Sequence, residues 1–457
     1  MEQRQRDKHA DHLSPSTTGA ETGRAIVIEP WLKRAGKGEG ARASADMRTP
    51  EARLEEAAGL ARAIDLNVVQ AGLVTLNQVR PATYIGTGKV DEIAGLVKSL
   101  AASVVVMDCP VSPVQQRNLE KAWSAKVIDR TGLILEIFGR RARTREGALQ
   151  VELAHLTYQK SRLVRSWTHL ERQRGGFGFL GGPGETQLEA DRRVIEDRIR
   201  RIEGELDKVK RTRQLHRDAR RRVPYPIVAL VGYTNAGKST LFNRMTAASV
   251  LSADLLFATL DPTLRAVALP HGNRIILSDT VGFISDLPTM LVAAFRATLE
   301  EVIEADVILH VRDMAHADAA AQSRDVEKVL DELGIAATDP RIVEVWNKID
   351  RLDTDARAQL FNLAERQPHT RQPIPLSALS GEGIDRLVGA IEARLGEKRQ
   401  TLELSIDPAD GAGLSWLYRH SEVLSKGMRD DGKLAVTVRA DADKAAQVRA
   451  KFEVSPG

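Results

Sequence analysis

The chain has 457 residues, of which 42% are hydrophobic and 4% aromatic, and this composition predicts a soluble globular protein with an aliphatic core. Such a length favours roughly three domains. No apolar run approaches the ~20 residues that span a bilayer, so we expect no transmembrane segment. The single cysteine, Cys109, excludes an internal disulfide and fits a reducing cytoplasm, where we expect the protein to act. Residues 1–24 lack the apolar centre of a signal peptide and are expected to form a disordered tail.

The net charge of +4 conceals an uneven distribution. Residues 140–222 hold 22 lysines and arginines against 12 aspartates and glutamates, so this segment is at +10 and the rest of the chain, by subtraction, is at −6. A positive field concentrated in one segment indicates a polyanionic partner. A solvated helix face is the alternative explanation of such a stretch.

Residues 25–139 alternate short apolar runs with helical patterns, which predicts a small α/β domain with a mainly parallel sheet. The strand-like runs are 25–28, 67–71, 104–108 and 126–129, and the helix-like runs are 51–64, 90–100 and 112–123. Cys109 follows one of these strands and is expected to be a packed thiol. Gly86–Lys89 precede a helix and could contact the phosphate of a second nucleotide or of RNA, although a plain turn is the favoured explanation.

Residues 140–223 predict a basic helical hairpin. Apolar residues recur in heptad-like steps from Leu188 to Val209, and the same steps run from Leu149 to Leu163. Each stripe is too narrow to be buried alone, so we expect the two helices to pack against each other in antiparallel fashion. The second helix, from Glu189 to Arg221, would extend ~50 Å at 1.5 Å per residue.

The segment between these helices, Arg165–Glu185, interleaves arginines with aromatic residues and has six glycines within 175–184. Arginines bind phosphates, planar side chains stack on unpaired bases, and glycines allow close backbone approach. We therefore expect RNA contacts at this tip, whereas a flexible connector with inward-packed aromatics is the alternative. The candidate RNA contacts are Arg165, Trp167, Arg172, Arg174, Phe177 and Phe179.

Residues 224–398 alternate six strand-like runs with helices and predict a doubly wound sheet. The runs are 227–231, 266–269, 274–277, 307–311, 342–346 and 374–376. The first run leads into a glycine-rich loop and then into a helix, which is the context that a P-loop requires. Its residues are Gly232, Tyr233, Thr234, Asn235, Ala236, Gly237, Lys238 and Ser239.

Four further segments follow in the order and spacing of a guanine-nucleotide switch. A threonine in the first can close over magnesium, the second can reach the metal and sense a γ-phosphate, the third can select guanine, and the fourth can contact the base through its backbone. They are Phe257, Ala258, Thr259, Leu260 and Asp261; Asp279, Thr280, Val281 and Gly282; Asn347, Lys348, Ile349 and Asp350; and Ser377, Ala378 and Leu379. Together they predict binding of GTP and GDP with Mg²⁺.

Residues 399–457 predict a small α/β C-terminal domain of unassigned task. Its expected elements are strands at 402–406 and 433–438 and helices at 414–424 and 442–452.

The nucleotide motifs and much of the chain before them resemble the HflX family of ribosome-associated GTPases. The resemblance outside those motifs rests on Arg130–Phe138, Arg141–Thr144, Leu149–Ala154 and Gly181–Glu189. It implies a factor that binds the large ribosomal subunit through ribosomal RNA, hydrolyses GTP and separates stalled or stress-arrested ribosomes. A switch acting on a protein partner, with the hairpin as a docking arm, is the alternative. We expect no DNA partner and a monomeric protein.

Lys238, Thr259 and Gly282 are the predicted catalytic residues, and Ser239 and Thr259 the predicted magnesium ligands. Thr259 is preferred because the resemblance places the magnesium threonine there, and Thr263 is the alternative. Phe283 follows Gly282, where a glutamine would orient the attacking water, so hydrolysis is expected to be slow without a partner. Asn235 makes potassium a candidate activator, or else serves the turn alone.

Overall fold

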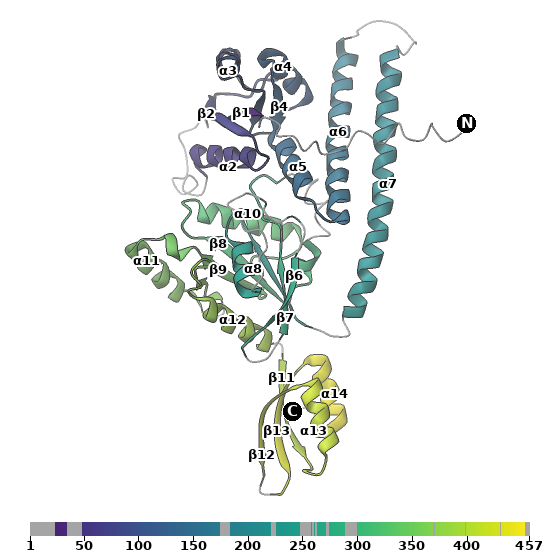
Figure 1. Cartoon of the computed structure of the whole chain (residues 1–457), viewed down its shortest axis with the longest axis vertical. Coiled ribbons are helices and arrows are strands. Elements are labelled where there is room, and N and C mark those ends of the chain that lie inside the picture. Colours follow the sequence, from purple (N-terminus) through teal and green to yellow (C-terminus); the bar gives the residue numbers. More distant parts are fainter. Residues whose placement is uncertain are drawn as a thin grey trace, which may run out of the picture. The chain divides into compact units, whose positions relative to one another are not determined.

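The computed structural model describes residues 23–33, 48–173, 183–220, 225–246, 257, 260, 263–270, 274–287, 299–368, 371–397, 399–429 and 431–452 (Figure 1). These residues form two compact units, one around the N-terminal sheet and the other holding the larger sheet. The α/β class predicted from the sequence is confirmed.

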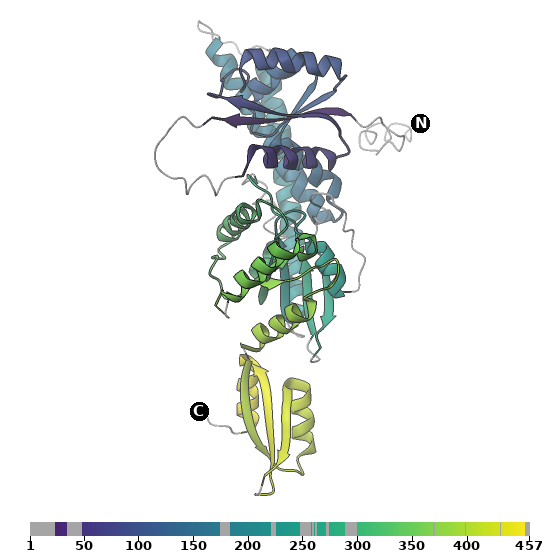
Figure 2. The same ribbon diagram turned by 90° about the vertical axis from the view of Figure 1, so that its left-hand side faces the viewer.

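The N-terminal sheet is parallel throughout its described strands, which lie in the order β2-β1-β3-β4. The connection from β1 to β2 runs towards one edge of the sheet, and the connections from β2 to β3 and from β3 to β4 run towards the other edge. As a result, α3 and α4 pack together on one face and α2 covers the other (Figure 2). The elements are β1 (Arg24–Leu32), α2 (Pro50–Arg62), β2 (Asn67–Leu76), α3 (Thr87–Ser99), β3 (Val104–Met107), α4 (Pro113–Trp123) and β4 (Lys126–Asp129). Each matches a run predicted from the sequence.

Local sequence explains why these helices begin where they do. Ser112 accepts a hydrogen bond from the Gln115 backbone while the Gln115 side chain accepts one from the Ser112 backbone, which forms a capping box ahead of α4. Thr49 caps α2, whose first residue is Pro50. Cys109 is buried as predicted, and burial raises the pKa of its thiol.

Three helices follow: α5 (Arg130–Arg141), α6 (Arg145–Gln173) and α7 (Pro183–Arg220). Leu149 packs with Ile202 and Leu206 of α7 in a narrow apolar seam. Ion pairs flank that seam in antiparallel register: Arg145 with Glu205, Glu152 with Arg198 and Lys160 with Glu196. The predicted antiparallel hairpin is therefore present.

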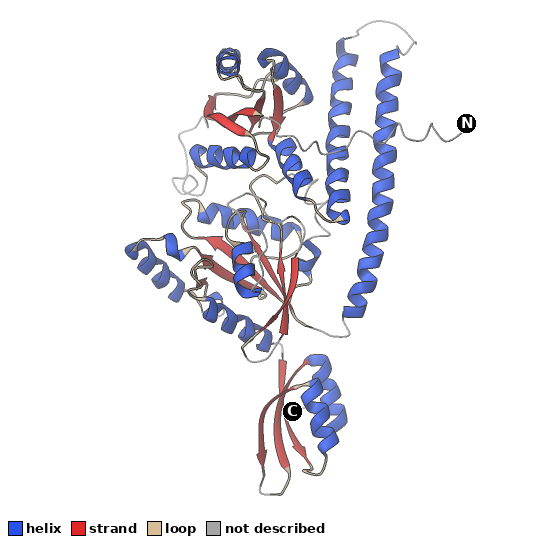
Figure 3. Cartoon of the chain, viewed as in Figure 1, coloured by secondary structure: helices blue, strands red, loops and turns tan. Residues whose placement is uncertain are grey.

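The larger sheet has the order β10-β9-β8-β5-β7-β6 among its described strands, and only β6 runs antiparallel to its neighbour. Helices lie around this sheet (Figure 3). Its strands are β5 (Ile227–Gly232), β6 (Thr263–Ala268), β7 (Arg274–Asp279), β8 (Val307–Asp313), β9 (Ile342–Asn347) and β10 (Ile374–Pro375). Its helices include α8 (Lys238–Thr246), α10 (Ala319–Glu332), η1 (Ile349–Arg351), α11 (Thr354–Glu365) and α12 (Ile384–Glu397).

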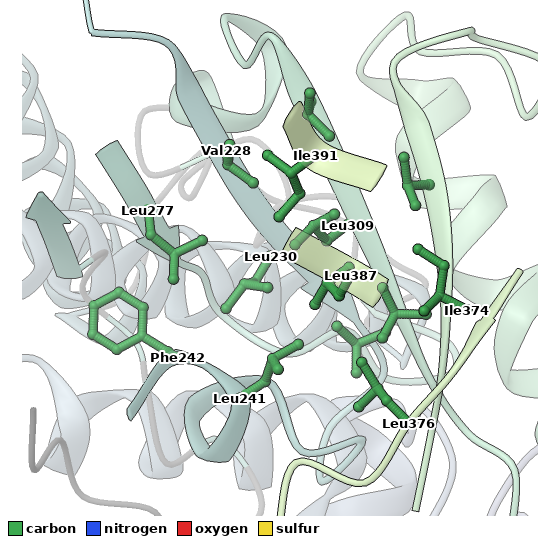
Figure 4. Packing of buried hydrophobic residues seen from close by; sticks show 14 of the residues in the cluster. Val228, Leu230, Leu241, Phe242, Leu277, Leu309, Ile374, Leu376, Leu387 and Ile391 are labelled. Carbon is green, nitrogen blue, oxygen red and sulfur yellow. The ribbon is translucent and has the colours of Figure 1, made fainter. Parts of the chain in front are cut away.

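Alternate residues of the central strands form the core beneath α8 and α12 (Figure 4). Leu230 and Leu309 of the sheet meet Phe242 of α8 and Leu387 of α12, and all four are fully buried. Each such side chain contributes about 1.5–3 kcal/mol relative to exposure. This packing fixes the carboxyl ends of β5, β7, β9 and β10, which lead into predicted nucleotide segments.

The C-terminal elements form a small antiparallel sheet of order β11-β13-β12, and one prediction for this region is wrong. The elements are β11 (Arg399–Ile406), α13 (Gly411–His420), β12 (Glu422–Met428), β13 (Leu434–Asp441) and α14 (Ala442–Phe452). The helix expected to reach Leu424 ends at His420, because Ser421 is extended and the following residues pair with β13. Strand pairing there outweighs the helical spacing of leucines.

Candidate functional site

Two P-loop glycines occupy positions where any side chain would be strained. Gly232 has a φ of +151°, and a Cβ there would lie 2.2 Å from the carbonyl oxygen of Val311. Gly237 has a φ of +93°, and its Cβ would lie 2.2 Å from Nδ2 of Asn347. The loop can therefore pass this closely between β8 and Asn347 only because both residues lack a side chain.

Lys238 begins α8 and is buried within the loop that precedes it. Its ammonium donates to the carbonyl oxygens of Gly232, at 3.1 Å, and Tyr233, at 2.8 Å. An ammonium has three donors, so these bonds orient the group and use two of them within the described part of the chain. Burial lowers the pKa of Lys238 to about 8, with Asp279 opposing the shift and Lys348 adding to it. A phosphate would meet a desolvated, preoriented cation.

Ser239 and Asp279 lie side by side next to this lysine. The hydroxyl of Ser239 donates to Oδ2 of Asp279 at 2.7 Å, and Asp279 is fully buried at the end of β7. Hydroxyl and carboxylate oxygens are the hard donors that Mg²⁺ prefers. The pair therefore fits the predicted arrangement, in which Ser239 binds the ion and Asp279 reaches it through water.

The loop after Asp279 is paired to the P-loop by backbone hydrogen bonds. Phe283 N–H donates to Gly232 O at 3.1 Å, and Thr234 N–H donates to Phe283 O at 2.7 Å. A Cβ on Gly282 would lie 2.9 Å from Cα of Thr234 and 3.0 Å from Nζ of Lys238. Glycine is thus required where γ-phosphate sensing was predicted.

The same loop is also fixed on its buried side. Thr280 donates its hydroxyl proton to the carbonyl of Leu230 at 2.6 Å, while Val281 is buried. Phe283 is 1% exposed, so its ring is an apolar anchor rather than a group that could orient water.

Asn347 joins the phosphate end of the site to the base end. Its Nδ2 donates to Ala236 O at 2.8 Å, and its Oδ1 accepts from Ala378 N–H at 2.9 Å. Nearby, Ser377 donates to Oδ1 of Asp350 at 2.5 Å. The third and fourth predicted segments therefore converge as expected for a guanine site.

The two residues between Asn347 and Asp350 attach this loop to the rest of the fold. Lys348 is left-handed, with a φ of 67°, and its ammonium pairs with Asp313 at 2.8 Å. Ile349 is fully buried, whereas Leu379 is exposed.

Sequence reasoning missed Arg244, which lies on α8 six residues after Lys238. Its Nε donates to Ala378 O at 3.2 Å, and its Nη2 donates to Leu379 O. No local pattern marks this arginine, because its partners lie more than 130 residues away in sequence.

The structure describes only part of the predicted segment 257–261. Phe257 and Leu260 are buried, and Phe257 packs edge-on against Phe138 with 4.8 Å between ring centroids. Ala258, Thr259 and Asp261 lie outside the described residues, and Thr263 begins β6 opposite Asp279.

The predicted RNA contacts give no side-chain geometry. Arg165, Trp167 and Arg172 fall in α6 beyond its described side chains, and Arg174, Phe177 and Phe179 lie outside the described residues. Among the helices that the structure describes, none is long and apolar enough to cross a membrane.

A P-loop joined by hydrogen bonds to a magnesium-type carboxylate and to a guanine-type Asn-Lys-x-Asp loop defines a P-loop guanine-nucleotide-binding protein. Four family models match the chain along its length. Their descriptions are GTP-binding GTPase N-terminal (residues 51–139), GTP-binding GTPase Middle Region (141–220), 50S ribosome-binding GTPase (227–348) and HflX C-terminal domain (362–456).

Curated relatives agree with these matches. The chain is 50% identical to GTPase HflX of Magnetococcus marinus, over 81% of this chain and 84% of that protein. It is 45% identical to GTPase HflX of Escherichia coli, over 84% and 89% respectively. A GTP-binding protein of Sulfolobus solfataricus in complex with GDP is similar at 22% identity and a TM-score of 0.43, over 82% of this chain and 99% of that one. The chain belongs to the HflX family, and it is a GTP-binding GTPase.

Proposed function

We propose that this GTPase binds the large ribosomal subunit through ribosomal RNA and dissociates stalled or stress-arrested ribosomes, acting as a monomer in the cytoplasm. The observation that carries the proposal is the basic hairpin: among their described side chains, two long helices share a thin apolar seam, while their segment holds a surplus of ten positive charges over 140–222. The match of residues 227–348 to a family described as 50S ribosome-binding GTPase supports it.

Among the described side chains of the hairpin, the apolar seam between the two helices is small. The described seam consists of four leucines and Ile202, whereas exposed arginines such as Arg193 and Arg201 lie on the outer surface of the hairpin. Segments of this kind gain little from packing alone and much from a polyanion, whose phosphates exchange their counterions for the protein's cations. RNA contact at the tip, by the six residues predicted from the sequence, completes the proposal.

In the proposed reaction, water attacks the γ-phosphorus of GTP, and the protein supplies position and charge. Lys238 meets the β- and γ-phosphates, the Gly282 N–H meets the γ-phosphate, and Asp350 accepts from the guanine N1–H and amino group. Mg²⁺, when bound by Ser239 and Thr259, would neutralise charge on the phosphates. Asn347 holds the P-loop and the loop at Ser377–Leu379 together through its hydrogen bonds to Ala236 and Ala378.

Nothing on Phe283 can order the attacking water, so we propose slow intrinsic hydrolysis that the ribosome stimulates. Asn235 has a φ of 58°, inside the P-loop turn. This position makes its side chain the proposed ligand of an activating potassium ion, and turnover with KCl compared with NaCl tests that role.

The test of the proposed function is GTP turnover with and without purified large ribosomal subunits. We expect strong stimulation that is lost in a variant without residues 165–185 and reduced when Arg165, Arg172 and Arg174 are changed to glutamine. GDP affinity should stay unchanged in both variants. Arg200→Gln is the matched control, because this exposed arginine of α7 already pairs with Asp197.

A GTP turnover rate that is unchanged by large ribosomal subunits and by intact ribosomes would contradict the ribosomal proposal. It would favour the alternative, in which the hairpin docks a protein partner. Stimulation that survives both tip variants would keep the ribosome as activator but remove the tip from its recognition.

A further inference from the structure

The side chain of Tyr233 connects the P-loop to the end of residues 282–285, which we call the switch segment. Its phenol oxygen accepts a hydrogen bond from the backbone N–H of Ser285 at 2.8 Å, and the residue is 4% exposed. Ser285 follows Phe283, whose two backbone bonds already hold the start of the segment. The tyrosine hydroxyl therefore extends this pairing by one more anchor, three residues beyond Gly282.

Arg48 covers the ring of this tyrosine. Its guanidinium carbon lies 4.6 Å from the ring centroid, and Nη2 pairs with Oδ2 of Asp325 at 2.7 Å. Asp325 lies on α10, which packs against the sheet beside β5 and β8. Arg48 belongs to the same compact unit as the GTPase sheet, and its side chain is 10% exposed.

We propose that Arg48 is a positioning residue for GTP hydrolysis, which holds Tyr233 in the rotamer that anchors switch segment 282–285. The proposal deepens the proposed function, since it rests on the contact of Gly282 with the γ-phosphate. It requires neither the ribosome nor the hairpin tip, so it can fail or succeed independently of them.

The physical argument is one of preorganisation. A guanidinium that lies over the tyrosine ring and is held by a carboxylate restricts the ring, because a ring that leaves this position loses both the cation over its face and the hydrogen bond from Ser285 N–H. With the ring fixed, Ser285 N–H keeps a partner and the segment stays close to the P-loop. Without Arg48, the ring can turn away and the Gly282 N–H samples positions from which it misses the γ-phosphate. Contacts made only as charge develops are those whose loss lowers kcat.

The experiment compares single-turnover GTP hydrolysis, GDP affinity and amide hydrogen exchange in the full chain without ribosomes. For Arg48→Ala and Tyr233→Phe we expect a three- to tenfold fall in hydrolysis rate, with GDP affinity within twofold of the starting protein. The double variant should be no slower than either single variant, because both changes break one linkage. Exchange should rise across residues 283–286 in all three.

Three further variants separate positioning from general stability. Arg48→Lys keeps a cation over the ring and should recover part of the rate. Asp325→Asn removes the carboxylate charge that holds Arg48 and should slow hydrolysis mildly. Lys328→Ala changes an exposed cation one turn further along α10 and should leave every value unchanged.

Several results would overturn the proposal. These are an unchanged or faster hydrolysis rate in Arg48→Ala, additive losses in the double variant, or a loss of GDP affinity that accounts for the slower turnover. Gly282→Ala is measured in parallel as a variant that displaces the segment directly, because its Cβ would meet Cα of Thr234 and Nζ of Lys238. If that variant loses activity while Arg48→Ala does not, the proposed site stands and the positioning role falls. If Arg48→Ala fails to fold, Tyr233→Phe and Arg48→Lys decide the question, since they keep most of the packing.

Discussion

Lys238 is the residue at which burial most changes the chemistry of the site. The amine is desolvated by burial, which lowers its pKa to about 8. Burial deprives the amine of water, whereas phosphate oxygens would place negative charge beside it and favour its charged form. Nucleotide binding must therefore raise the pKa of Lys238. Nucleotide binding and protonation of Lys238 are therefore linked.

The sign of this linkage gives the first prediction. Below about pH 8 the amine is charged before and after binding, so affinity is independent of its titration. Above that value the free protein takes up a proton on binding, and GDP affinity falls as pH rises, by up to about tenfold per pH unit. Titrations with a fluorescent GDP analogue across pH 7 to 9 would measure the slope.

Lys238→Arg is the matched variant for this prediction, because a guanidinium does not titrate in the same range. The guanine base also loses its N1 proton at alkaline pH, and that contribution is common to both proteins. We expect a steeper loss of affinity in the starting protein than in the arginine variant. Identical slopes would show that the lysine keeps its proton throughout.

At the scale of elements, α8 holds both ends of the nucleotide site. Its first residues, Lys238 and Ser239, lie where we propose that the phosphates and the metal bind, while Arg244 near its end bonds the carbonyls of Ala378 and Leu379. In a peptide unit the N–H points away from the C=O. Because the carbonyl of Ala378 is fixed towards α8, the N–H of Leu379 points away from α8, whereas the N–H of Ser380 donates to Oγ of Ser377. We propose that the Leu379 N–H faces the guanine base.

The second prediction follows from this geometry. Arg244→Gln should weaken GDP binding about tenfold, because a charge-assisted hydrogen bond is worth roughly 1.5–3 kcal/mol. ADP binding, which gains nothing from the guanine loop, should change little, so the preference for GDP over ADP falls by the same factor. Competition binding with both nucleotides measures this ratio.

Arg366→Gln, at an exposed arginine after α11, is the control for the Arg244 variant. Equal losses of GDP and ADP affinity would contradict a role in base recognition. They would instead place Arg244 among the residues that hold α8 in the fold.

The elements also show what the sequence could and could not predict. Strands followed by fixed-spacing motifs were predictable, because Gly232, Gly237 and Gly282 are demanded by close backbone approach at defined positions. Strand β12 was not, because its identity depends on pairing with β13 rather than on its own periodicity. Arg244 and Arg48 were missed for a related reason: their partners are distant in sequence, and no local spacing marks them.

At the scale of the whole molecule, the surplus of positive charge and the nucleotide-binding motifs lie in different segments of the chain. The nucleotide site lies in residues 224–398, whereas the positive surplus belongs to 140–222. A partner that meets the basic segment would be recognised by charge, and the GTPase site would report whether that partner is present. This separation predicts that the two activities respond differently to salt.

The last prediction is therefore a salt titration. Binding of the large subunit should weaken linearly with ionic strength on logarithmic axes, because phosphate contacts release counterions. GDP affinity, set by buried groups such as Asn347 and Lys238, should change far less. Replacing Arg165, Arg172 and Arg174 by glutamine should reduce the slope by about 2 to 3, at roughly 0.7–0.9 for each of the three lost phosphate contacts. Arg200→Gln should keep the original slope. If the triple variant weakens binding equally at every salt concentration, these arginines act through shape instead of charge, and the hairpin docks as a protein surface would.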